Sequence, residues 1–332
     1  MTDFSSLKAG DFVEGAFAIR STDGAGEGLR DYSNKPGGFF VLRLGNKTGD
    51  MTVKYWGGKN PETAKNLFSS LAVGDVLSVK GKCMHDSYSK ETVISVNEEV
   101  RYGSPEEYLK KMASGEFDAS EFLPSLPAEK IQALAESLTV TIDSVTNPHL
   151  KSLLKTVFED ELFKLSFQRS PAARNNHHNY VGGLLEHSLN VAKLCEEMCS
   201  FYNLDRDLLI TGALLHDSGK TSEYAASASI EITDEGRLIG HIQMGAENIS
   251  RKTGEIEGFP IELKNKIIHM ILSHHGELEY GSPKRPAFPE AIALFHADYM
   301  DSSVKNTLQE LEGKADEPWI YSKILRRHLT TK

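Results

Sequence analysis

The sequence is poor in cysteine and has no long apolar run, and both absences narrow the class of protein. Its 332 residues include only three cysteines, Cys83, Cys195 and Cys199, which are too few for a disulfide framework. No stretch approaches the roughly 18 apolar residues that a membrane-spanning helix needs. The first residues, MTDFSSLKAGDF, lack the basic start and apolar core of a secretory signal. We therefore expect a cytoplasmic protein that works without a membrane.

An excess of positive charge is also absent. Residues 1–101 carry 13 basic and 13 acidic side chains, and the remainder carries 24 and 34, which is the whole net charge of −10. An acidic half does not attract a polyanion by its net charge. If it acts on phosphates, the positive charge must come from bound metal ions or from a few placed lysines and arginines. The length is about right for two domains, and 39% hydrophobic residues are ordinary for a globular protein.

The first hundred residues have the pattern of a small β-barrel. Strands are expected at residues 12–19, 39–44, 51–56, 76–83 and 92–96, separated by polar turns. A short helix with a proline in its first turn is expected at residues 61–71, after the third strand. Five strands with one helix after the third predict a Greek-key barrel of the OB type over residues 1–102.

One face of this barrel is a candidate nucleic-acid surface. Strand alternation places Phe39, Val41 and Arg43 opposite the core face, together with Lys54 and Trp56. An aromatic ring beside two cations suits base stacking and phosphate attraction. Arg43, Lys54 and Trp56 are therefore expected to bind nucleic acid, although Trp56 packing against a second domain is the alternative.

The rest of the chain is predicted to be helical. Residues 103–160 are expected to form a helical connector, with helices that begin at Pro105 and Pro127. Residues 161–332 are expected to form an all-α domain, interrupted by one hairpin at residues 230–239. The predicted fold class is thus multidomain α and β, with an N-terminal barrel, a connector and a C-terminal helical domain.

Nine of the 12 histidines lie between His177 and His296, and some of them fall in apolar helices. His187 shares a helix face with apolar residues, so it is expected to point into the interior. A single histidine there would usually be a core residue. However, the adjacent pair His216-Asp217 ends the apolar run 208–215, and burying such a pair is costly unless it is paired or bound to a metal.

Similar residues end or begin the helices that follow. His241 stands at a predicted helix start, His274-His275 ends the apolar run 267–272, and Asp298 lies inside an apolar helix. Spacings of 29, 24, 33 and 23 residues place the successive groups on different helices. Neutral imidazoles combined with carboxylates suit Mn, Fe, Co, Ni or Zn. The pattern predicts a buried metal site where these helices meet.

The chain resembles a known family at these residues. The series His187, His216-Asp217 and Asp298 is similar to the signature of HD-domain metal-dependent phosphohydrolases, and the additional histidines resemble the subset that binds two metals. More narrowly, residues 177–189 and 273–283 resemble the YhaM-type 3′–5′ exoribonucleases, which combine an N-terminal OB-fold with an HD domain. The resemblance extends over nearly the whole chain.

The resemblance implies two divalent cations for each chain, with Asp217 as the bridge between them. The first would be held by His187, His216, Asp217 and Asp298, and the second by Asp217, His241, His274 and His275. Mn is the first choice of metal, with Fe, Co, Ni, Zn or Mg as alternatives. Two cations about 3.5–4 Å apart can clamp a phosphodiester and supply the charge that the acidic half lacks.

Several other residues are candidates for the reaction or for binding. Lys220, three residues after Asp217, could contact a phosphate oxygen as part of the catalytic site or could be a solvated lysine at a helix end. His178, Lys284 and Arg285 are candidate contacts to nucleic acid, the alternatives being a core histidine and a plain basic loop.

Two acidic residues near the predicted ligands, Glu186 and Asp301, are expected to lie beside those ligands or in solvent.

The resemblance implies a metal-dependent 3′–5′ exonuclease that hydrolyses single-stranded RNA, or DNA as well. An HD phosphohydrolase of nucleotides or cyclic dinucleotides is one alternative, although a small substrate needs no polymer-binding barrel. A nucleic-acid-binding protein with an inactive HD site is another, although the complete set of ligands argues against it. The oligomeric state stays open, with a homo-oligomer among the options.

Overall fold

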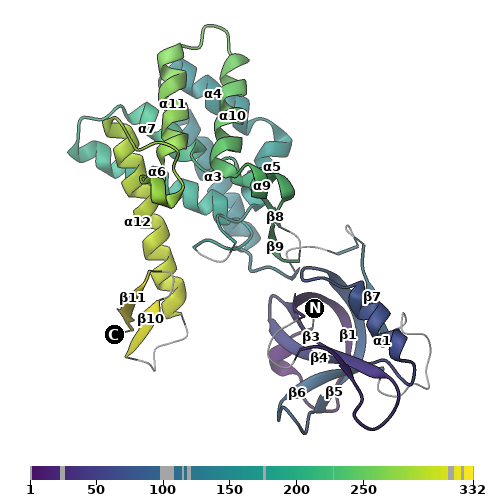
Figure 1. Cartoon of the computed structure of the whole chain (residues 1–332). Coiled ribbons are helices and arrows are strands. Elements are labelled where there is room, and N and C mark those ends of the chain that lie inside the picture. Colours follow the sequence, from purple (N-terminus) through teal and green to yellow (C-terminus); the bar gives the residue numbers. More distant parts are fainter. Residues whose placement is uncertain are drawn as a thin grey trace. The chain divides into compact units, whose positions relative to one another are not determined.

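The chain folds into two compact units. The structure is a computed structural model, and it describes residues 2–22, 27–97, 108–113, 116–117, 121–174, 177–226, 228–312, 318–322 and 325–331. One unit comprises Met1–Pro124 and Ala226–Glu231, and the other comprises Ser125–Ala225 and Ile232–Lys332. Figure 1 shows the first as a β-barrel and the second as a bundle of helices. In the described ranges, no helix is long and apolar enough to cross a bilayer.

Five strands close a barrel of the predicted OB type. The strands of this unit are β1 (Phe12–Ser21), β2 (Gly28–Asp31), β3 (Gly38–Asn46), β4 (Gly49–Trp56), β5 (Val76–His85), β6 (Thr92–Val96) and β7 (Leu109–Lys111). The closed path runs β1-β3-β4-β6-β5, and β5 pairs back to β1. Helix α1 (Pro61–Ser69) follows β4, and its N-terminus is capped by Asn60. The predicted five-stranded barrel and the position of its helix are confirmed.

Strand alternation decides which side chains fill the barrel. Phe40 and Tyr55 lie opposite each other on β3 and β4, and both are completely buried with their rings stacked at 4.7 Å. Trp56 and Phe39 form the neighbouring pair and point to the outer face, as the period of two requires. The outer face of β3 and β4 therefore carries the residues predicted for nucleic-acid binding.

Strand β7 lies where the sequence predicts the continuation of a helix. The sequence predicts a helix from Pro105, which lies outside the described residues. The segment that follows, Leu109–Lys111, forms strand β7 and pairs antiparallel with β5. Leu109 is 1% exposed in the barrel core whereas Lys110 and Lys111 are exposed, so burial on the sheet outweighs local helix propensity.

The predicted hairpin at residues 230–239 is also wrong in its second half. Strand β9 (Ile230–Ile232) pairs with the preceding strand β8 (Tyr224–Ala226), and Asp234–Leu238 forms helix α9. The side chain of Thr233 accepts a hydrogen bond from the Gly236 amide, which caps this helix at its N-terminus. This cap stabilises a helix in the segment around Gly236, where a hairpin turn was expected.

The second unit is helical and buries its apolar faces in one core. Its longer helices are α3 (Ala128–Ser144), α4 (Pro148–Phe158), α5 (Glu161–Arg169), α6 (Gly183–Phe201), α7 (Arg206–Leu215), α10 (His241–Gly254), α11 (Ile261–Ser273) and α12 (Pro289–Leu311). Helix α6 packs against α3, α5, α7 and α12. The short helix α8 (Lys220–Glu223) follows α7.

The boundaries of the predicted segments differ from those of the two observed units. Of the predicted connector, residues 103–160, the part up to Pro124 belongs to the barrel unit, and α3 and α4 belong to the helical unit. After α12, strands β10 (Trp319–Ser322) and β11 (Arg327–Thr330) form an antiparallel hairpin that the sequence did not predict.

Candidate functional site

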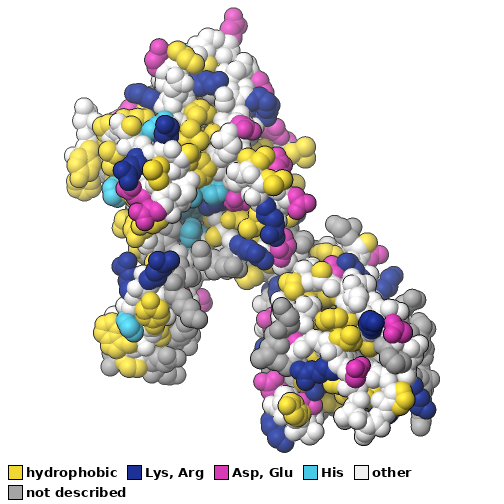
Figure 2. Space-filling model, viewed as in Figure 1, with side chains coloured by type: hydrophobic (Ala, Val, Ile, Leu, Met, Phe, Trp, Pro, Cys, Tyr) yellow, Lys and Arg dark blue, Asp and Glu magenta, His cyan; other side chains and the backbone are white. Residues whose placement is uncertain are grey.

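The seven side chains predicted as metal ligands come together inside the helical unit. The elements that carry them are α6 for His187, the end of α7 for His216 and Asp217, the first turn of α10 for His241, the end of α11 for His274 and His275, and α12 for Asp298. Five helices thus contribute to one place, as the spacing predicted. His187, His216 and His274 are completely buried, and Asp217 is 1% exposed. In the space-filling view of Figure 2, histidine side chains reach the surface close together on this unit.

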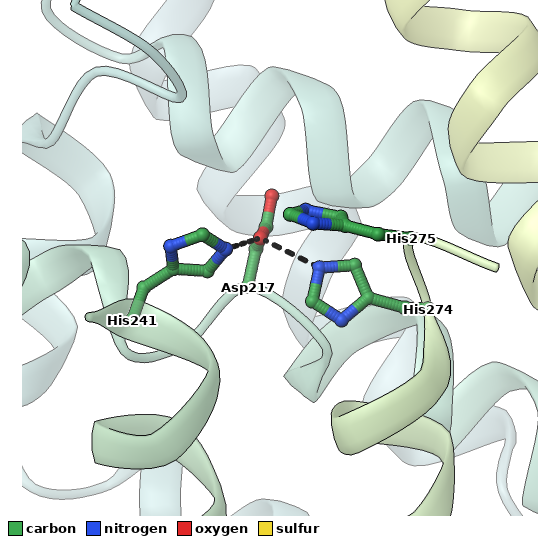
Figure 3. A group of neighbouring side chains, drawn as sticks. All are labelled: Asp217, His241, His274 and His275. Carbon is green, nitrogen blue, oxygen red and sulfur yellow. Dashed lines mark ion pairs between the residues drawn. The ribbon is translucent and has the colours of Figure 1, made fainter. Parts of the chain in front are cut away.

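Asp217 stands between two groups of histidines. Its Oδ2 lies 3.3 Å from Nε2 of His187 and 3.3 Å from Nε2 of His216. Its Oδ1 lies 3.6 Å from Nε2 of His241 and 3.4 Å from Nε2 of His274, the side that Figure 3 shows. One carboxylate therefore presents a separate oxygen to each group, which is the arrangement that a bridging ligand requires.

Each group has the size of a cation site. In the first, the ligand atoms of His187, His216 and Asp298 lie within 4.8 Å of one another. In the second, those of Asp217, His241, His274 and His275 lie within the same distance. We call these the first and the second group.

The residues of the second group fit a cation, because they bury polar atoms that have no other partner. Oδ1 of Asp217 and Nε2 of His241 and His274 are buried and make no hydrogen bond within the described part of the chain. Each such atom costs about 1–3 kcal/mol when it is left unsatisfied. A single divalent cation would satisfy all three, since each offers a lone pair toward the same point.

Helix ends orient two of these histidines. Nδ1 of His216 lies 2.8 Å from the Ala213 carbonyl oxygen, and Nδ1 of His274 lies 2.7 Å from that of Ile271. Carbonyls in the last turn of a helix have no amide partner within the helix. Because a carbonyl can only accept, Nδ1 must carry the hydrogen, and the lone pair of Nε2 is left for the site.

The Nδ1 atoms of the other three histidines have different neighbours. His275 directs Nδ1 to the Tyr280 carbonyl oxygen at 3.0 Å. Nδ1 of His187 is hydrogen-bonded to Oδ2 of Asp301 at 2.7 Å. Nδ1 of His241 lies 2.9 Å from Oε2 of Glu223, which is an ion-pair contact without hydrogen-bond geometry.

The sequence left Asp301 open between a position beside the ligands and one in solvent, and it gave no sign of Glu223. Asp301 lies one turn after Asp298 on the same helix, and this spacing is a readable signal. Glu223 precedes His241 by 18 residues and lies on another helix, so no periodicity connects the two.

Two glycines allow the ligands to approach one another. A Cβ at Gly219 would lie 2.0 Å from the carbonyl oxygen of His241, so only glycine lets the start of α10 lie against the segment that carries Asp217. Gly276 follows His275 with a φ of +81°, and a Cβ there would lie 2.3 Å from the Phe295 ring. Both glycines belong to the motifs of the sequence, and close approach explains them.

The protonation states of His275 and of the two aspartates suit a metal site. Burial would raise the pKa of Asp217, but Lys220 and His216 hold it well below its usual range. The pKa of Asp298 is lowered in the same way, since neighbouring histidines outweigh its burial. Burial lowers the pKa of His275 to about 3, so its ring is neutral at pH 7. Ionised carboxylates and neutral imidazoles are the forms that bind metals.

His187 differs from His275 in this respect. Burial alone would lower the pKa of its ring, but Asp217, Asp298 and Asp301 raise it well above the usual value. A cation that binds to Nε2 of His187 must therefore replace a proton.

Of the two interpretations of Lys220, a contact to phosphate or a solvated lysine, the second is wrong. Its side chain is 6% exposed, and Nζ lies 2.6 Å from Oδ2 of Asp217. It therefore adds a fixed positive charge beside the first group.

His178 does not lie where a contact to nucleic acid would place it. The side chain is completely buried, with Nε2 2.9 Å from Oδ2 of Asp301 and Nδ1 3.1 Å from Oε2 of Glu186. Nδ1 also lies 2.8 Å from the hydroxyl of Tyr180. Both ring nitrogens are engaged, so His178 has no free edge for a base or a phosphate. Glu186 is likewise buried, in contact with Lys130.

Lys284 and Arg285 lie in the loop that leads from His275 to α12. Both are exposed, and Nε of Arg285 lies 2.8 Å from Oε2 of Glu277. They are available at the surface, although Arg285 already has an acidic partner.

The barrel has a cleft on the face that strand alternation predicted. It has a volume of about 780 Å³, and its lining includes Phe39, Val41, Arg43, Lys54, Trp56 and Tyr88. The three residues predicted to bind nucleic acid all line it. At one wall the Trp56 ring lies 5.1 Å from Phe39 and 6.1 Å from Tyr32, nearly parallel to the latter.

Two features of the cleft were not visible in the sequence. Lys54 is paired with Asp86 at 2.9 Å, so its charge is partly neutralised. Tyr32, from the segment between β2 and β3, stacks on Trp56 although it does not itself line the cleft, and no strand periodicity marks its direction. The indole nitrogen of Trp56 donates a hydrogen bond to Ser95 at 2.8 Å and holds this ring in place.

Comparisons with known proteins agree with this geometry. Residues 184–303 match the HD domain family, a range that contains all seven predicted ligands. The 3′–5′ exoribonuclease YhaM of Bacillus subtilis is 31% identical over 277 residues, which are 82% of this chain and 81% of the relative. YhaM of Bacillus velezensis is 29% identical over 306 residues, which are 90% of this chain and 87% of the relative. The solved HD domain of the L. monocytogenes phosphodiesterase PgpH shares 17% identity over half of this chain, and its TM-score of 0.30 is too low to support an inference.

Proposed function

Because the chain belongs to the YhaM-type 3′–5′ exoribonuclease family and is a metal-dependent 3′–5′ exonuclease, we propose that it degrades single-stranded RNA with two divalent cations, Mn²⁺ first among them. The observation that carries the two-cation proposal is the position of Asp217, whose two carboxylate oxygens face different groups of histidines. The alternative functions, a phosphohydrolase of small nucleotides and an inactive binding protein, have no comparable support.

In this proposal the seven ligands hold the two cations. His187, His216, Asp217 and Asp298 would hold one cation, and Asp217, His241, His274 and His275 would hold the other. Two such ions supply electrostatic stabilisation of the attacking and leaving oxygens of a phosphodiester.

The protein residues around the ions would complete the catalytic site. Lys220 contributes a charge beside Asp217 that attracts a phosphate oxygen. The proximity of Lys284 and Arg285 to His275 along the chain supports a role for them at the nucleic-acid backbone.

The barrel cleft would bind the strand that the helical site cuts. Aromatic faces accept any base, and Arg43 and Lys54 attract phosphates, which suits an enzyme without sequence preference.

The three cysteines are free, in agreement with a reduced cytoplasmic compartment.

The direct test uses a single-stranded RNA of about 20 nucleotides labelled at either end, with a DNA of the same sequence beside it. With Mn²⁺ we expect a ladder of shortening products from the 5′-labelled RNA and immediate release of a labelled mononucleotide from the 3′-labelled RNA. EDTA should stop both reactions. Fragments cut inside the strand, or hydrolysis of a cyclic dinucleotide in preference to RNA, would contradict the proposal.

The barrel cleft gives a second prediction. Replacing Trp56 and Lys54 together by alanine should weaken binding of an RNA oligomer about fivefold to a hundredfold, because stacking on an aromatic side chain is worth about 1–3 kcal/mol per base. Hydrolysis of a small chromogenic phosphodiester should change little, since it has no base to stack. Fluorescence anisotropy and a colorimetric assay measure the two quantities.

Trp319, the other of the two tryptophans, provides the matched control. It is 59% exposed on β10, in the helical unit, and Trp319→Ala should leave RNA binding unchanged. If the double variant in the cleft lost equal activity on both substrates, the effect would be structural and the cleft would not be the RNA site.

A further inference from the structure

The five histidines of the metal centre differ in what holds their Nδ1 atoms. In three of them Nδ1 lies against a backbone carbonyl oxygen, but in His187 and His241 it lies against a carboxylate. His187 belongs to the first group and His241 to the second. Each group therefore contains one histidine with an acidic side chain behind it.

Asp301 holds His187 through an oxygen that is shared with a second histidine. Its Oδ2 lies 2.7 Å from Nδ1 of His187 and 2.9 Å from Nε2 of His178. The side chain is only 11% exposed.

A buried chain of polar contacts supports Asp301 from behind. Nδ1 of His178 lies 3.1 Å from Oε2 of Glu186. Glu186 in turn contacts Lys130 of α3 and lies 3.7 Å from Lys305 of α12. Every side chain in this series has a partner of complementary charge or hydrogen-bonding type, so the series keeps one geometry without leaving a buried polar group unsatisfied.

Glu223 holds His241 at two points. Its Oε1 accepts a hydrogen bond from the backbone amide of His241 at 3.1 Å. Its Oε2 lies 2.9 Å from Nδ1 of the ring as a charged neighbour, without hydrogen-bond geometry. Glu223 is 9% exposed, at the end of α8. One carboxylate thus fixes both the start of α10 and the direction of its first side chain.

We propose that Asp301 and Glu223 are positioning residues that set the affinities of the two cation sites independently, Asp301 through His187 and Glu223 through His241. This inference rests on the two-cation function proposed above. A carboxylate fixes the tautomer of a ligating imidazole and makes its other nitrogen a stronger electron-pair donor. A backbone carbonyl carries no net charge, so the other three histidines lack this contribution.

The test compares the full-length variants Asp301→Asn and Glu223→Gln, which keep the shape of each side chain and remove its charge. Mn²⁺ binding is measured by calorimetry, and bound metal by elemental analysis after dialysis. We expect each variant to lose about 10- to 100-fold in affinity for one ion and to keep the affinity for the other. Saturating Mn²⁺ should return turnover toward the wild-type value, which it would not do for a misfolded protein.

Asp207 provides the control for a purely structural effect. Its side chain is 13% exposed, close to the 11% of Asp301, and its Oδ2 accepts hydrogen bonds from Thr146 and Asn147. Asp207→Asn should lower the Tm of the protein and leave Mn²⁺ affinity unchanged. His178→Gln, one step behind Asp301, should weaken the same ion as Asp301→Asn but by less, and it replaces that variant if Asp301→Asn does not fold.

The outcomes separate this inference from the function on which it rests. If the wild-type chain binds two ions and neither carboxylate variant changes their affinities, the positioning roles are overturned and the two-cation proposal stands. Loss of both ions in either single variant, with no rescue by Mn²⁺, also overturns independent positioning. If the wild-type chain binds only one ion, the two-cation proposal is overturned, and the assignment of one carboxylate to each ion falls with it.

Discussion

Replacing Asp217 by alanine should abolish phosphodiester hydrolysis and empty both cation sites, with the two units still folded. Its Oδ2 faces His187 and His216, and its Oδ1 faces His241 and His274. Metal ions contribute several kcal/mol to the stabilisation of such a transition state. Since about 1.4 kcal/mol corresponds to a factor of ten in rate, activity should fall by about a thousandfold or more.

Two further variants make this result interpretable. Asp217→Ala leaves Lys220 buried without its partner. Asp217→Asn avoids this, because it keeps the side-chain volume and one oxygen near Lys220. Glu262→Gln removes a carboxylate from an exposed position on α11 and should behave as the wild type. Elemental analysis and circular dichroism accompany the RNA assay. A folded Asp217→Ala protein with near-normal turnover would show that the site has been assigned to the wrong residues.

His241→Ala should remove one ion and keep the other, and it should lose most of the nuclease activity. His241 belongs only to the second group, which it forms with Asp217, His274 and His275. The first group keeps His187, His216, Asp217 and Asp298, enough for one cation. One ion cannot stabilise both the attacking and the leaving oxygen, so binding of a single metal should not sustain hydrolysis.

The measurement is the number of metal ions per chain, which should fall from about two toward one. His296→Ala is the matched control, because His296 is exposed on α12 two residues before Asp298 and outside both groups. Wild-type protein that is fully active with a single ion would contradict the prediction, and the surplus histidines would then be left for substrate.

The sequence alone determined the features that depend on local periodicity. Alternation at residues 39–44 and 51–56 separated the barrel core from the outer face, because successive side chains of a strand point to opposite sides. Apolar runs that end in His216-Asp217 and His274-His275 placed these ligands at helix ends. The spacing of the groups was enough to put them on different helices, and the family resemblance then arranged them in two overlapping sets.

Only the tertiary structure decided which ligand each supporting carboxylate contacts. Glu223 reaches His241 across 18 residues, and Asp301 joins His178 to His187 across more than 110. The same holds in the barrel, where Asp86 pairs with Lys54, and for Leu109, which leaves a helical pattern to become strand β7. These contacts depend on where packed elements bring distant residues together, and neither the period of a helix nor that of a strand contains this information.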